Sequence, residues 1–293
     1  MKTGFVSIVG RPNVGKSTLL NKLLKTKLAI TSDKVGTTRN NILGVYNDSD
    51  SQIIFVDTPG IAKANDKLGE VLNSLAYSSF SNDLVLFLVD IASGFGPNDK
   101  KILEKLKQEE QKVILVLTKI DLIKKDKLME RILEIKDLYN FCDIVPISSV
   151  KNDNVDELLK VIKENLEEGQ KYFEDDFFTN MPEKYLVSEM IREKVLNLTK
   201  QEVPHSVSCY VLKMDFSKEK VVISATIVVD RDNLKGIIIG KNGKMLKEIG
   251  SLARTDLERY FDKKVYLDLF VKVIENWRSK ESTIKELLNL EDE

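Results

Sequence analysis

Several kinds of residue are scarce in this sequence, and each scarcity narrows the possible chemistry. The 293 residues include one histidine, His205, and two cysteines, Cys142 and Cys209. A single histidine excludes a His-rich zinc site. The two cysteines lie far apart and match no metal-binding or redox spacing, so we expect the protein in a reducing cytoplasm.

Long apolar runs are also absent. No stretch approaches the ~18 consecutive apolar residues of a membrane-spanning helix. The N-terminus has one lysine and a short apolar run that leads directly into a glycine loop, which indicates a first strand and not a secretory signal. The net charge of −1 indicates no partner by itself, but the stretch from Leu234 to Lys247 holds four lysines and no acidic residue.

A regular alternation of β-rich runs and amphipathic stretches fills residues 3–167, as in a parallel sheet covered on both faces. Strands are predicted at Phe5–Val9, Ile42–Tyr46, Ile53–Val56, Leu84–Val89, Val113–Leu117 and Ile144–Ile147. Helices are predicted at Lys16–Lys25, Leu68–Phe80, Asp99–Glu109, Lys127–Tyr139 and Asp156–Leu166. We therefore expect an α/β domain over residues 1–168.

A change in composition marks the end of this domain. Residues 169–183 combine acidic and aromatic residues with a proline, and we interpret them as a linker. Beyond it we predict helices at Tyr185–Leu198, Lys244–Tyr260 and Ser279–Leu290, and strands at Val207–Met214, Val221–Val229 and Val265–Val273. Pro204 and His205 are expected to open a strand. The order helix, strand, strand, helix, strand predicts an α+β domain over residues 184–293.

The strongest motif is Gly10-Arg11-Pro12-Asn13-Val14-Gly15-Lys16-Ser17, which fits the GxxxxGK[ST] phosphate loop between a strand and a helix. Backbone N–H groups and the helix N-terminus would bind phosphate oxygens. Lys16, expected on an exposed loop, would reach the β- and γ-phosphates, and the Ser17 hydroxyl would bind Mg²⁺. The alternative is a glycine-rich structural turn, which the flanking strand and helix disfavour.

Three further motifs follow strands in the order of a guanine-nucleotide site. Asp57-Thr58-Pro59-Gly60 would bind Mg²⁺ through Asp57 and the γ-phosphate through the Gly60 N–H. Thr118-Lys119-Ile120-Asp121 supplies a carboxylate that can accept hydrogen bonds from N1–H and the amino group of guanine, a pattern that adenine lacks. Ser148-Ser149 could offer a backbone N–H to guanine O6. Together they predict GTP and GDP as ligands and disfavour an ATPase.

The predicted nucleotide-binding residues are Gly10, Asn13, Val14, Gly15, Lys16, Ser17, Thr18, Asp57, Gly60, Thr118, Lys119, Asp121, Ser148 and Ser149. With Gly36-Thr37-Thr38-Arg39, these motifs resemble the small GTPases of the translation-factor superclass, in the neighbourhood of Era and EngA. The resemblance implies that Thr38 binds Mg²⁺ and the γ-phosphate together with Ser17 and Asp57, with the adjacent Thr37 as an alternative. It also implies that Lys16 and Thr38 are catalytic.

The sequence departs from this pattern at a few positions. Thr118 stands where most members have asparagine, which predicts a weaker hydrogen bond to the phosphate loop, and Val150 stands where many have a polar residue. Ile61 occupies the place of a water-orienting glutamine, so hydrolysis must use other groups. Asn13 matches an asparagine that helps bind K⁺ in some relatives, which would give it a catalytic role; alternatively, it only shapes the loop.

The second domain contains Ile237-Ile238-Ile239-Gly240-Lys241-Asn242-Gly243-Lys244, an apolar run that leads into a GxxG loop. In K-homology (KH) domains such a loop binds the backbone of about four single-stranded nucleotides. The predicted RNA-binding residues are Gly240, Lys241, Asn242, Gly243 and Lys244, with a simple turn as the alternative. The element order is similar to that of the type II KH fold. Trp277 is expected in the core, not as a base-stacking platform.

A GTPase domain followed by a KH domain resembles the Era family across nearly the whole chain, and Tyr185–Lys194 and Leu269–Trp277 are typical stretches. The resemblance implies a Ras-like P-loop GTPase domain with a mostly parallel sheet, then a type II KH domain. It implies a Mg²⁺-dependent, monomeric GTPase switch that binds the 3′ region of 16S ribosomal RNA and assists small (30S) ribosomal subunit assembly. The alternative is a signalling GTPase that docks a protein or membrane partner; its polar C-terminal helix predicts only weak peripheral membrane association.

Overall fold

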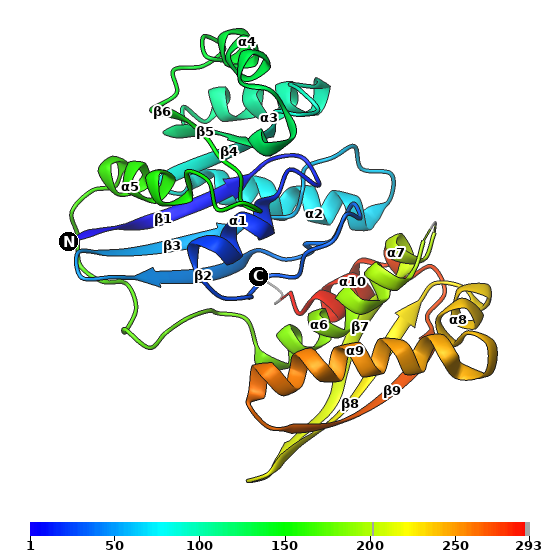
Figure 1. Ribbon diagram of the computed structural model, residues 1–293. Helices are drawn as coiled ribbons and strands as arrows, with labels where there is room; N and C mark the ends of the chain where they lie inside the picture. Colours follow the sequence, from blue (N-terminus) through cyan, green and yellow to red (C-terminus); the bar gives the residue numbers. More distant parts are fainter. Residues whose placement is uncertain (201, 291–293) are drawn as a thin grey trace. The chain divides into compact units, whose positions relative to one another are not determined.

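The computed structural model describes residues 1–200 and 202–290, and the chain divides into two compact units (Figure 1). The first unit comprises Met1–Thr31, Thr38–Ala64 and Gly69–Asn180. The second comprises Ser32–Thr37, Asn65–Leu68 and the chain from Met181 onward. The domain limits at residues 168 and 184 stay predictions, and no pattern in the sequence indicated that two short segments of the first half would belong to the second unit.

A six-stranded sheet with the order β2-β3-β1-β4-β5-β6 forms the centre of the first unit. Only β2 runs antiparallel to its neighbour, and the other pairs are parallel. The strands are β1 (Lys2–Val9), β2 (Ile42–Asn47), β3 (Ser51–Asp57), β4 (Leu84–Asp90), β5 (Val113–Thr118) and β6 (Asp143–Pro146). All predicted strands of this half are therefore present, and the mostly parallel sheet is confirmed.

Helices cover both faces of this sheet. The helices are α1 (Lys16–Leu23), α2 (Lys67–Ser78), α3 (Pro97–Gln108), α4 (Lys125–Ile135) and α5 (Val155–Asn165). One face of β4 and β5 packs on buried side chains of α2, α3 and α4 in a single core cluster. α1 lies against β1, β3 and α5. Because β4 and β5 are buried on both faces, they are continuous apolar runs and not alternating ones.

The parallel strands determine where a site can form. β1, β3, β4 and β5 all end at the same edge of the sheet, and the motifs around Gly10, Asp57 and Asp121 follow three of these ends. Ligands of open α/β sheets bind outside the carboxyl ends of the strands. The fold therefore brings the four separate motifs to one edge.

The stretch predicted as a linker runs along the first unit. The Val45 N–H donates to the Phe178 carbonyl at 2.9 Å, and the Thr179 hydroxyl donates to the Leu43 carbonyl at 2.6 Å. The Gln52 side chain accepts from the backbone N–H groups of Tyr172 and Phe173 at 2.7 and 3.0 Å. These contacts satisfy exposed backbone groups on the edge strand β2 and hold residues 172–179 in place.

The second unit has a three-stranded sheet in which β7 and β8 are antiparallel and β8 and β9 are parallel. Its elements are α6 (Glu183–Leu198), α7 (Val203–Ser206), β7 (Ser208–Phe216), β8 (Lys220–Val229), α8 (Asp232–Ile239), α9 (Lys244–Phe261), β9 (Lys264–Val273) and α10 (Glu281–Leu288). α6 packs on β7 and α9, and α9 also packs on β9. This order contains two helices before the last strand that the sequence did not predict, the short α7 and one longer additional helix.

That additional helix, α8, corrects the prediction that Ile237–Ile239 is a plain apolar run into a loop. Leu234 and Ile238, four residues apart, are buried, while Ile237 is 48% exposed. The spacing is helical, and the three consecutive isoleucines hid it. Pro204 and His205 do not open a strand either: they lie in α7, where proline fits the first turn because that position needs no N–H.

Trp277 is fully buried, as predicted, and its indole N–H donates to the Ser206 carbonyl at 3.0 Å. Within the described residues, no helix is long and apolar enough to cross a bilayer.

Candidate functional site

The loop between β1 and α1 has a backbone that few residues can adopt. Gly15 has φ +101°, and Asn13 also lies in the left-handed region at φ 65°. A Cβ on Gly10 would come within 2.6 Å of the Leu88 carbonyl oxygen, so only glycine fits between the loop and β4. The loop ends at the N-terminus of α1, whose first N–H groups have no partner within the helix. This is the geometry of an anion site.

Lys16 begins α1 and is buried, 6% exposed, which corrects the expectation of an exposed loop lysine. Its Nζ donates to the carbonyls of Gly10 and Arg11 at 3.3 and 3.2 Å. Burial lowers the pKa of Lys16 to about 8, with Asp57 acting in the opposite direction. A buried ammonium that holds only loop carbonyls has a strong preference for a nearby anion.

Three oxygen-bearing side chains meet beside this lysine. The Ser17 hydroxyl donates to Asp57 Oδ2 at 2.6 Å and lies 2.8 Å from Thr38 Oγ1, which is 3.5 Å from the same carboxylate oxygen. Asp57 is fully buried, and its Oδ1 has no hydrogen-bond partner in the part of the chain that the structure describes. Burial raises the pKa of Asp57 to about 6, although Lys16 and the two hydroxyls lower it.

This group of side chains fits Mg²⁺. The donors are hard oxygens, and a buried carboxylate oxygen without a partner is costly unless a cation satisfies it. The described residues contain no group of three or more histidine, cysteine, aspartate or glutamate side chains that could hold a metal ion. One carboxylate with two hydroxyls leaves most coordination positions to water and phosphate, which is the usual situation for Mg²⁺ bound with a nucleotide.

The structure distinguishes the two adjacent threonines. The Thr38 hydroxyl is directed at Ser17 and Asp57, whereas the Thr37 hydroxyl donates to the Lys34 carbonyl at 2.6 Å. Of the two, only Thr38 is placed to bind the ion.

Gly60 and Ile61 bring the third motif against the phosphate loop. A Cβ on Gly60 would lie 2.8 Å from Pro12 N, so the two backbones touch at this point. The Ile61 N–H donates to the Gly10 carbonyl at 3.2 Å, and its side chain is buried in the core beneath α2 and α3. Ile61 therefore faces away from any attacking water.

Asp121 is held from the neighbouring loop. The Ser148 hydroxyl donates to Asp121 Oδ1 at 2.6 Å, and the Ile120 N–H donates to the Ile147 carbonyl at 3.3 Å. These hydrogen bonds connect the motif Thr118–Asp121 directly to the loop that carries Ser148 and Ser149. Each carboxylate oxygen has two lone pairs, so Asp121 can still accept two hydrogen bonds from guanine.

Two details around Asp121 refine the sequence prediction. The Ser148 N–H donates to the Asp153 carbonyl at 3.1 Å, so Ser148 acts through its hydroxyl, and Ser149 stays the candidate N–H donor to the base. The bond expected to be weak at Thr118 is present: its hydroxyl donates to the Val14 carbonyl at 2.8 Å, with the Val89 carbonyl at 3.3 Å. A threonine therefore links the base motif to the phosphate loop. Val14 is buried, and Val150 is exposed.

Sequence reasoning missed Asp90. It ends β4 and binds Lys119 Nζ at 2.8 Å through Oδ2. Lys119 has a strained left-handed backbone with φ 62°, and the ion pair with Asp90 fixes the direction of its side chain. The signal was an aspartate at the end of an otherwise apolar strand, on the edge that carries the other motifs.

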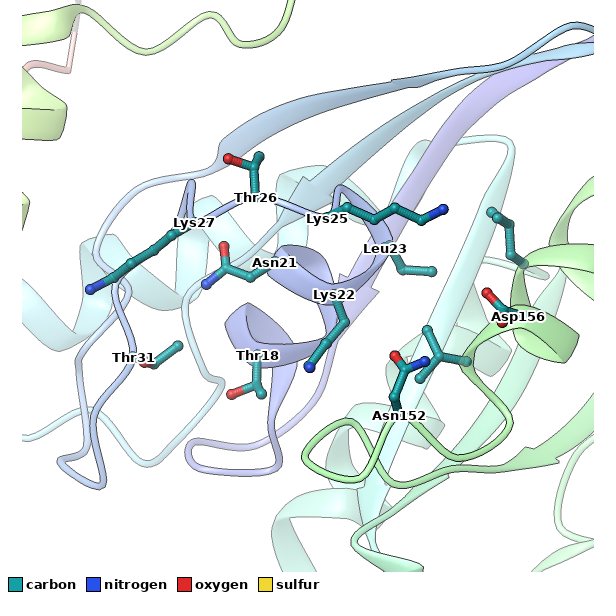
Figure 2. Close-up of a pocket in the computed structure, with 12 residues that line it drawn as sticks. Thr18, Asn21, Lys22, Leu23, Lys25, Thr26, Lys27, Thr31, Asn152 and Asp156 are labelled. Atoms are coloured by element: carbon teal, nitrogen blue, oxygen red, sulfur yellow. The ribbon is translucent and has the colours of Figure 1, made fainter. Parts of the chain in front are cut away.

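A hollow of ≈ 640 Å³ lies beside α1 and the start of α5 (Figure 2). Figure 2 shows Thr18 and Lys22 from α1 opposite Asn152, and the side chains of Lys25 and Lys27 pointing away from each other. Thr18 is the one predicted nucleotide-binding residue among those that line the hollow. The phosphate, metal and base residues described above lie outside the hollow.

In the second unit, the GxxG loop joins α8 to α9. Gly240 and Gly243 have φ +70° and +74°, and Asn242 has φ 53°. A Cβ on Gly240 would lie 2.7 Å from the Met245 Cβ, whereas a Cβ on Gly243 would meet nothing within 4 Å. Gly243 therefore faces open space. It borders a hollow of ≈ 460 Å³ whose lining includes Lys247 and Arg254 and the side chains Leu246, Leu267 and Leu269.

We expect Lys16→Ala to reduce the rate of nucleoside triphosphate hydrolysis by roughly 10²–10³-fold, because a preorganised charge at the phosphates is lost. Single-turnover hydrolysis measures this rate. Lys22→Ala, an exposed lysine in the last turn of the same helix, is the matched control. A Lys16→Ala rate equal to that of Lys22→Ala would contradict the phosphate assignment.

We expect Asp121→Asn to change base preference from guanine to xanthine by about 10²-fold, because the amide donates to the second xanthine carbonyl but repels the guanine amino group. Its remaining oxygen still accepts the Ser148 hydrogen bond. Competition between GDP and XDP measures the preference, and Asp126→Asn on α4 is the control. Unchanged guanine preference would exclude Asp121 from base recognition.

Comparison with known proteins agrees with both halves of the chain. Residues 5–119 match a family described as 50S ribosome-binding GTPase, and residues 202–278 match the KH domain. The chain is 43% identical to an Aquifex aeolicus Era variant bound to GDP·AlF₄⁻, with a TM-score of 0.95 and coverage of 98% of this chain and 99% of that one. It is also 43% identical to Era in complex with MgGDPNP and nucleotides 1506–1542 of 16S ribosomal RNA, with a TM-score of 0.95 and 98% of both chains covered. The chain belongs to the Era family, a GTPase domain followed by a KH domain.

Proposed function

We propose that this protein is a GTP-hydrolysing switch that binds the 3′ region of 16S ribosomal RNA and assists small (30S) ribosomal subunit assembly. One observation carries the proposal: a guanine-nucleotide site and an open GxxG loop occur in one chain that matches, over 98% of its length, an Era structure with MgGDPNP and 16S RNA nucleotides 1506–1542. We place the protein in the cytoplasm because the small ribosomal subunit, whose assembly it would assist, is assembled there.

Each nucleotide-site residue of the first unit would have a separate role in hydrolysis. Lys16 would neutralise charge on the β- and γ-phosphates, and the Gly60 N–H would donate to the γ-phosphate. Ser17, Thr38 and Asp57 would hold Mg²⁺, which supplies charge stabilisation to the phosphates when bound. Asp121 would select guanine, with Lys119 held along the base by Asp90. This division leaves the attacking water without a side chain that orients it.

In our proposal, a K⁺ ion next to the phosphates partly compensates for the absence of a water-orienting side chain. Ile61 is 4% exposed and belongs to the core, so the usual position for a water-orienting side chain is not used. Asn13 lies at the exposed turn of the phosphate loop, where its amide oxygen could bind a cation next to the phosphates. Its left-handed backbone is also consistent with a purely structural role.

The GxxG loop supports RNA as the partner of the second unit. Gly243 leaves its backbone open, and Lys241 and Lys244 flank it, so a sugar-phosphate chain can approach closely. The leucines of the adjoining hollow offer an apolar wall for bases. The alternative, docking of a protein or a membrane by a monomeric switch, lacks a comparable feature in the described residues; α10 carries Glu281 and Glu286 beside its one lysine, Lys285.

We expect hydrolysis to slow by about fivefold or more when Na⁺ replaces K⁺ at constant ionic strength, because a larger, weakly hydrated cation would stabilise the transition-state charge. Asn13→Gly removes the amide without straining the left-handed backbone, and it should abolish the difference between the two salts. Stopped-flow phosphate release measures both. Equal wild-type rates in K⁺ and Na⁺ would leave Asn13 with only its structural role.

We expect Gly243→Asp to weaken binding to the 3′ end of 16S RNA by about tenfold or more, because a carboxylate would stand where the phosphate chain passes. A Cβ at Gly243 would meet nothing within 4 Å, unlike one at Gly240, and aspartate is among the side chains that adopt the left-handed backbone, here φ +74°, at the lowest cost. Filter binding measures affinity at several salt concentrations, and the slope should decrease by about 0.7 for each phosphate that the loop no longer binds.

Two controls keep this result specific. Gly236→Asp adds the same charge on α8, where a Cβ also meets nothing, and should leave RNA affinity within about twofold. GTP hydrolysis should be unchanged in both variants. Full RNA affinity in a folded Gly243→Asp protein would point to the docking alternative.

A further inference from the structure

Asp90, at the end of β4, uses both of its carboxylate oxygens. Oδ2 binds Lys119 Nζ at 2.8 Å, and Oδ1 accepts the backbone N–H groups of Ala92 and Ser93 at 3.1 and 3.2 Å. The Asp90 backbone carbonyl also accepts the Ser93 hydroxyl and the Gly94 N–H, at 3.2 and 3.1 Å. One residue therefore holds both the lysine of the base motif and the turn that follows β4.

The same hydrogen bonds keep Asp90 charged. Its side chain is 13% exposed, and burial raises its pKa, but the hydrogen bonds from Lys119 and Ser93 outweigh burial and lower the pKa below its usual value. An ionised carboxylate accepts hydrogen bonds at both oxygens, whereas an amide accepts at one end and donates at the other. The three donors around Asp90 thus require a carboxylate.

The turn that follows β4 is also held by the phosphate loop. Nη2 of Arg11 donates to the Ser93 hydroxyl oxygen and, at 3.2 Å, to the Gly94 carbonyl. Arg11 Nε lies 3.4 Å from the buried Asp99 of α3, in an ion pair where Nε has no hydrogen-bond partner among the described residues. The hydrogen bonds of the Arg11 guanidinium therefore go to a turn whose conformation Asp90 fixes.

Arg11 in turn borders the lysine that would neutralise the phosphates. Its backbone carbonyl accepts from Lys16 Nζ at 3.2 Å, and the neighbouring Gly10 carbonyl accepts from the same Nζ at 3.3 Å. A shift of the Arg11 backbone would move an acceptor that holds the Lys16 ammonium. Misplacement of a positioning group by about 1 Å can cost about 10²-fold in rate.

We propose that Asp90 is a positioning residue for both ends of the nucleotide: Oδ2 orients Lys119 along the base, and Oδ1 fixes the turn that holds Arg11 of the phosphate loop. The inference rests on the proposed roles of Lys119 at the base and of Lys16 at the phosphates. Loss of the Lys119 contact should weaken nucleotide binding, and loss of the contact between the turn and Arg11 should slow hydrolysis.

Asp90→Asn separates the two contacts. The amide oxygen can still accept the N–H groups of the turn, but the NH₂ group cannot accept from Lys119. We expect GDP binding to weaken by about tenfold, because a charge-assisted hydrogen bond is lost, and the single-turnover hydrolysis rate under saturating conditions to stay within about twofold. Asp83→Asn is the matched control, because Asp83 directly precedes β4 and its carboxylate accepts the Phe5 N–H at 2.7 Å, outside the nucleotide site. It should change neither quantity.

Arg11→Met removes the contact on the other side of the turn. We expect the single-turnover rate to fall by about tenfold and GDP affinity to stay within about threefold. Asp90→Ala removes both contacts and should show both losses, and Arg11→Met in that background should lower the rate by less than twofold further. If Arg11→Met does not fold, Ser93→Ala removes only the hydroxyl between Arg11 and Asp90 and should lower the rate by about threefold.

Lys119→Met tests the function on which the inference rests. It should weaken GDP binding at least as much as Asp90→Asn, and Asp90→Asn in its background should weaken binding no further. Unchanged GDP affinity in Lys119→Met would show that the proposed role of Lys119 is wrong. The inference itself is overturned if Lys119→Met weakens binding while Asp90→Asn, folded by circular dichroism, binds GDP like the wild type. It is equally overturned if Lys16→Ala lowers the hydrolysis rate while folded Arg11→Met and Ser93→Ala proteins both keep the wild-type rate.

Discussion

Two buried charges, the Lys16 ammonium and the Asp57 carboxylate, impose the main constraint on the first unit. Burial lowers the pKa of Lys16 to about 8 and raises that of Asp57 to about 6, so each group is moved toward its neutral form. Among the described residues, the Asp57 Oδ1 lacks a hydrogen-bond partner, and Lys16 donates to the Gly10 and Arg11 carbonyls. In the proposed function, a phosphate would pair with the lysine and Mg²⁺ would pair with the carboxylate. Burying both charged groups costs free energy of folding. The groups stay in place because the ends of β1 and β3 hold both of them at one edge of the sheet.

Much of this site could be predicted from the sequence because each motif follows a strand with strong local signals. β4 and β5 are apolar runs of the length of a buried strand, and parallel strands bring their ends together whatever the loops between them do. Asp57 and Asp121 could thus be placed without any knowledge of side-chain contacts. The same reasoning could not place Asp90, whose role depends on where the left-handed Lys119 directs its side chain.

The details that the sequence could not supply depend on tertiary contacts. Three consecutive isoleucines fit a strand or a loop entry as well as a helix, and only the burial of Leu234 and Ile238 on one side distinguishes α8. The Ser148 N–H is a reasonable candidate for guanine O6 by sequence, but the Asp153 carbonyl accepts from it. Thr118 in place of asparagine predicted a weaker hydrogen bond to the phosphate loop, and the structure shows which bond it makes: its hydroxyl donates to the Val14 carbonyl, because the end of β5 lies close to that loop. In each case a residue type is compatible with several partners, and packing selects one.

Helix α6 is a further case in which packing selects the partners of polar side chains. Its buried residues include Ser188, Glu189, Arg192 and Glu193 together with apolar side chains on all sides, so it has no clear polar face. Burying an arginine and two glutamates in one helix is costly unless every charge finds a defined partner. Glu189 accepts from Nε and Nη2 of Arg192, each at 2.7 Å, and Lys194 lies 2.8 Å from Glu193. The Arg192 Nη1 is buried without a hydrogen-bond partner among the described residues, so the pairing of this guanidinium is incomplete. The charged residues of α6 are therefore held mainly by one another, which is why their partners could not be predicted from helical periodicity alone.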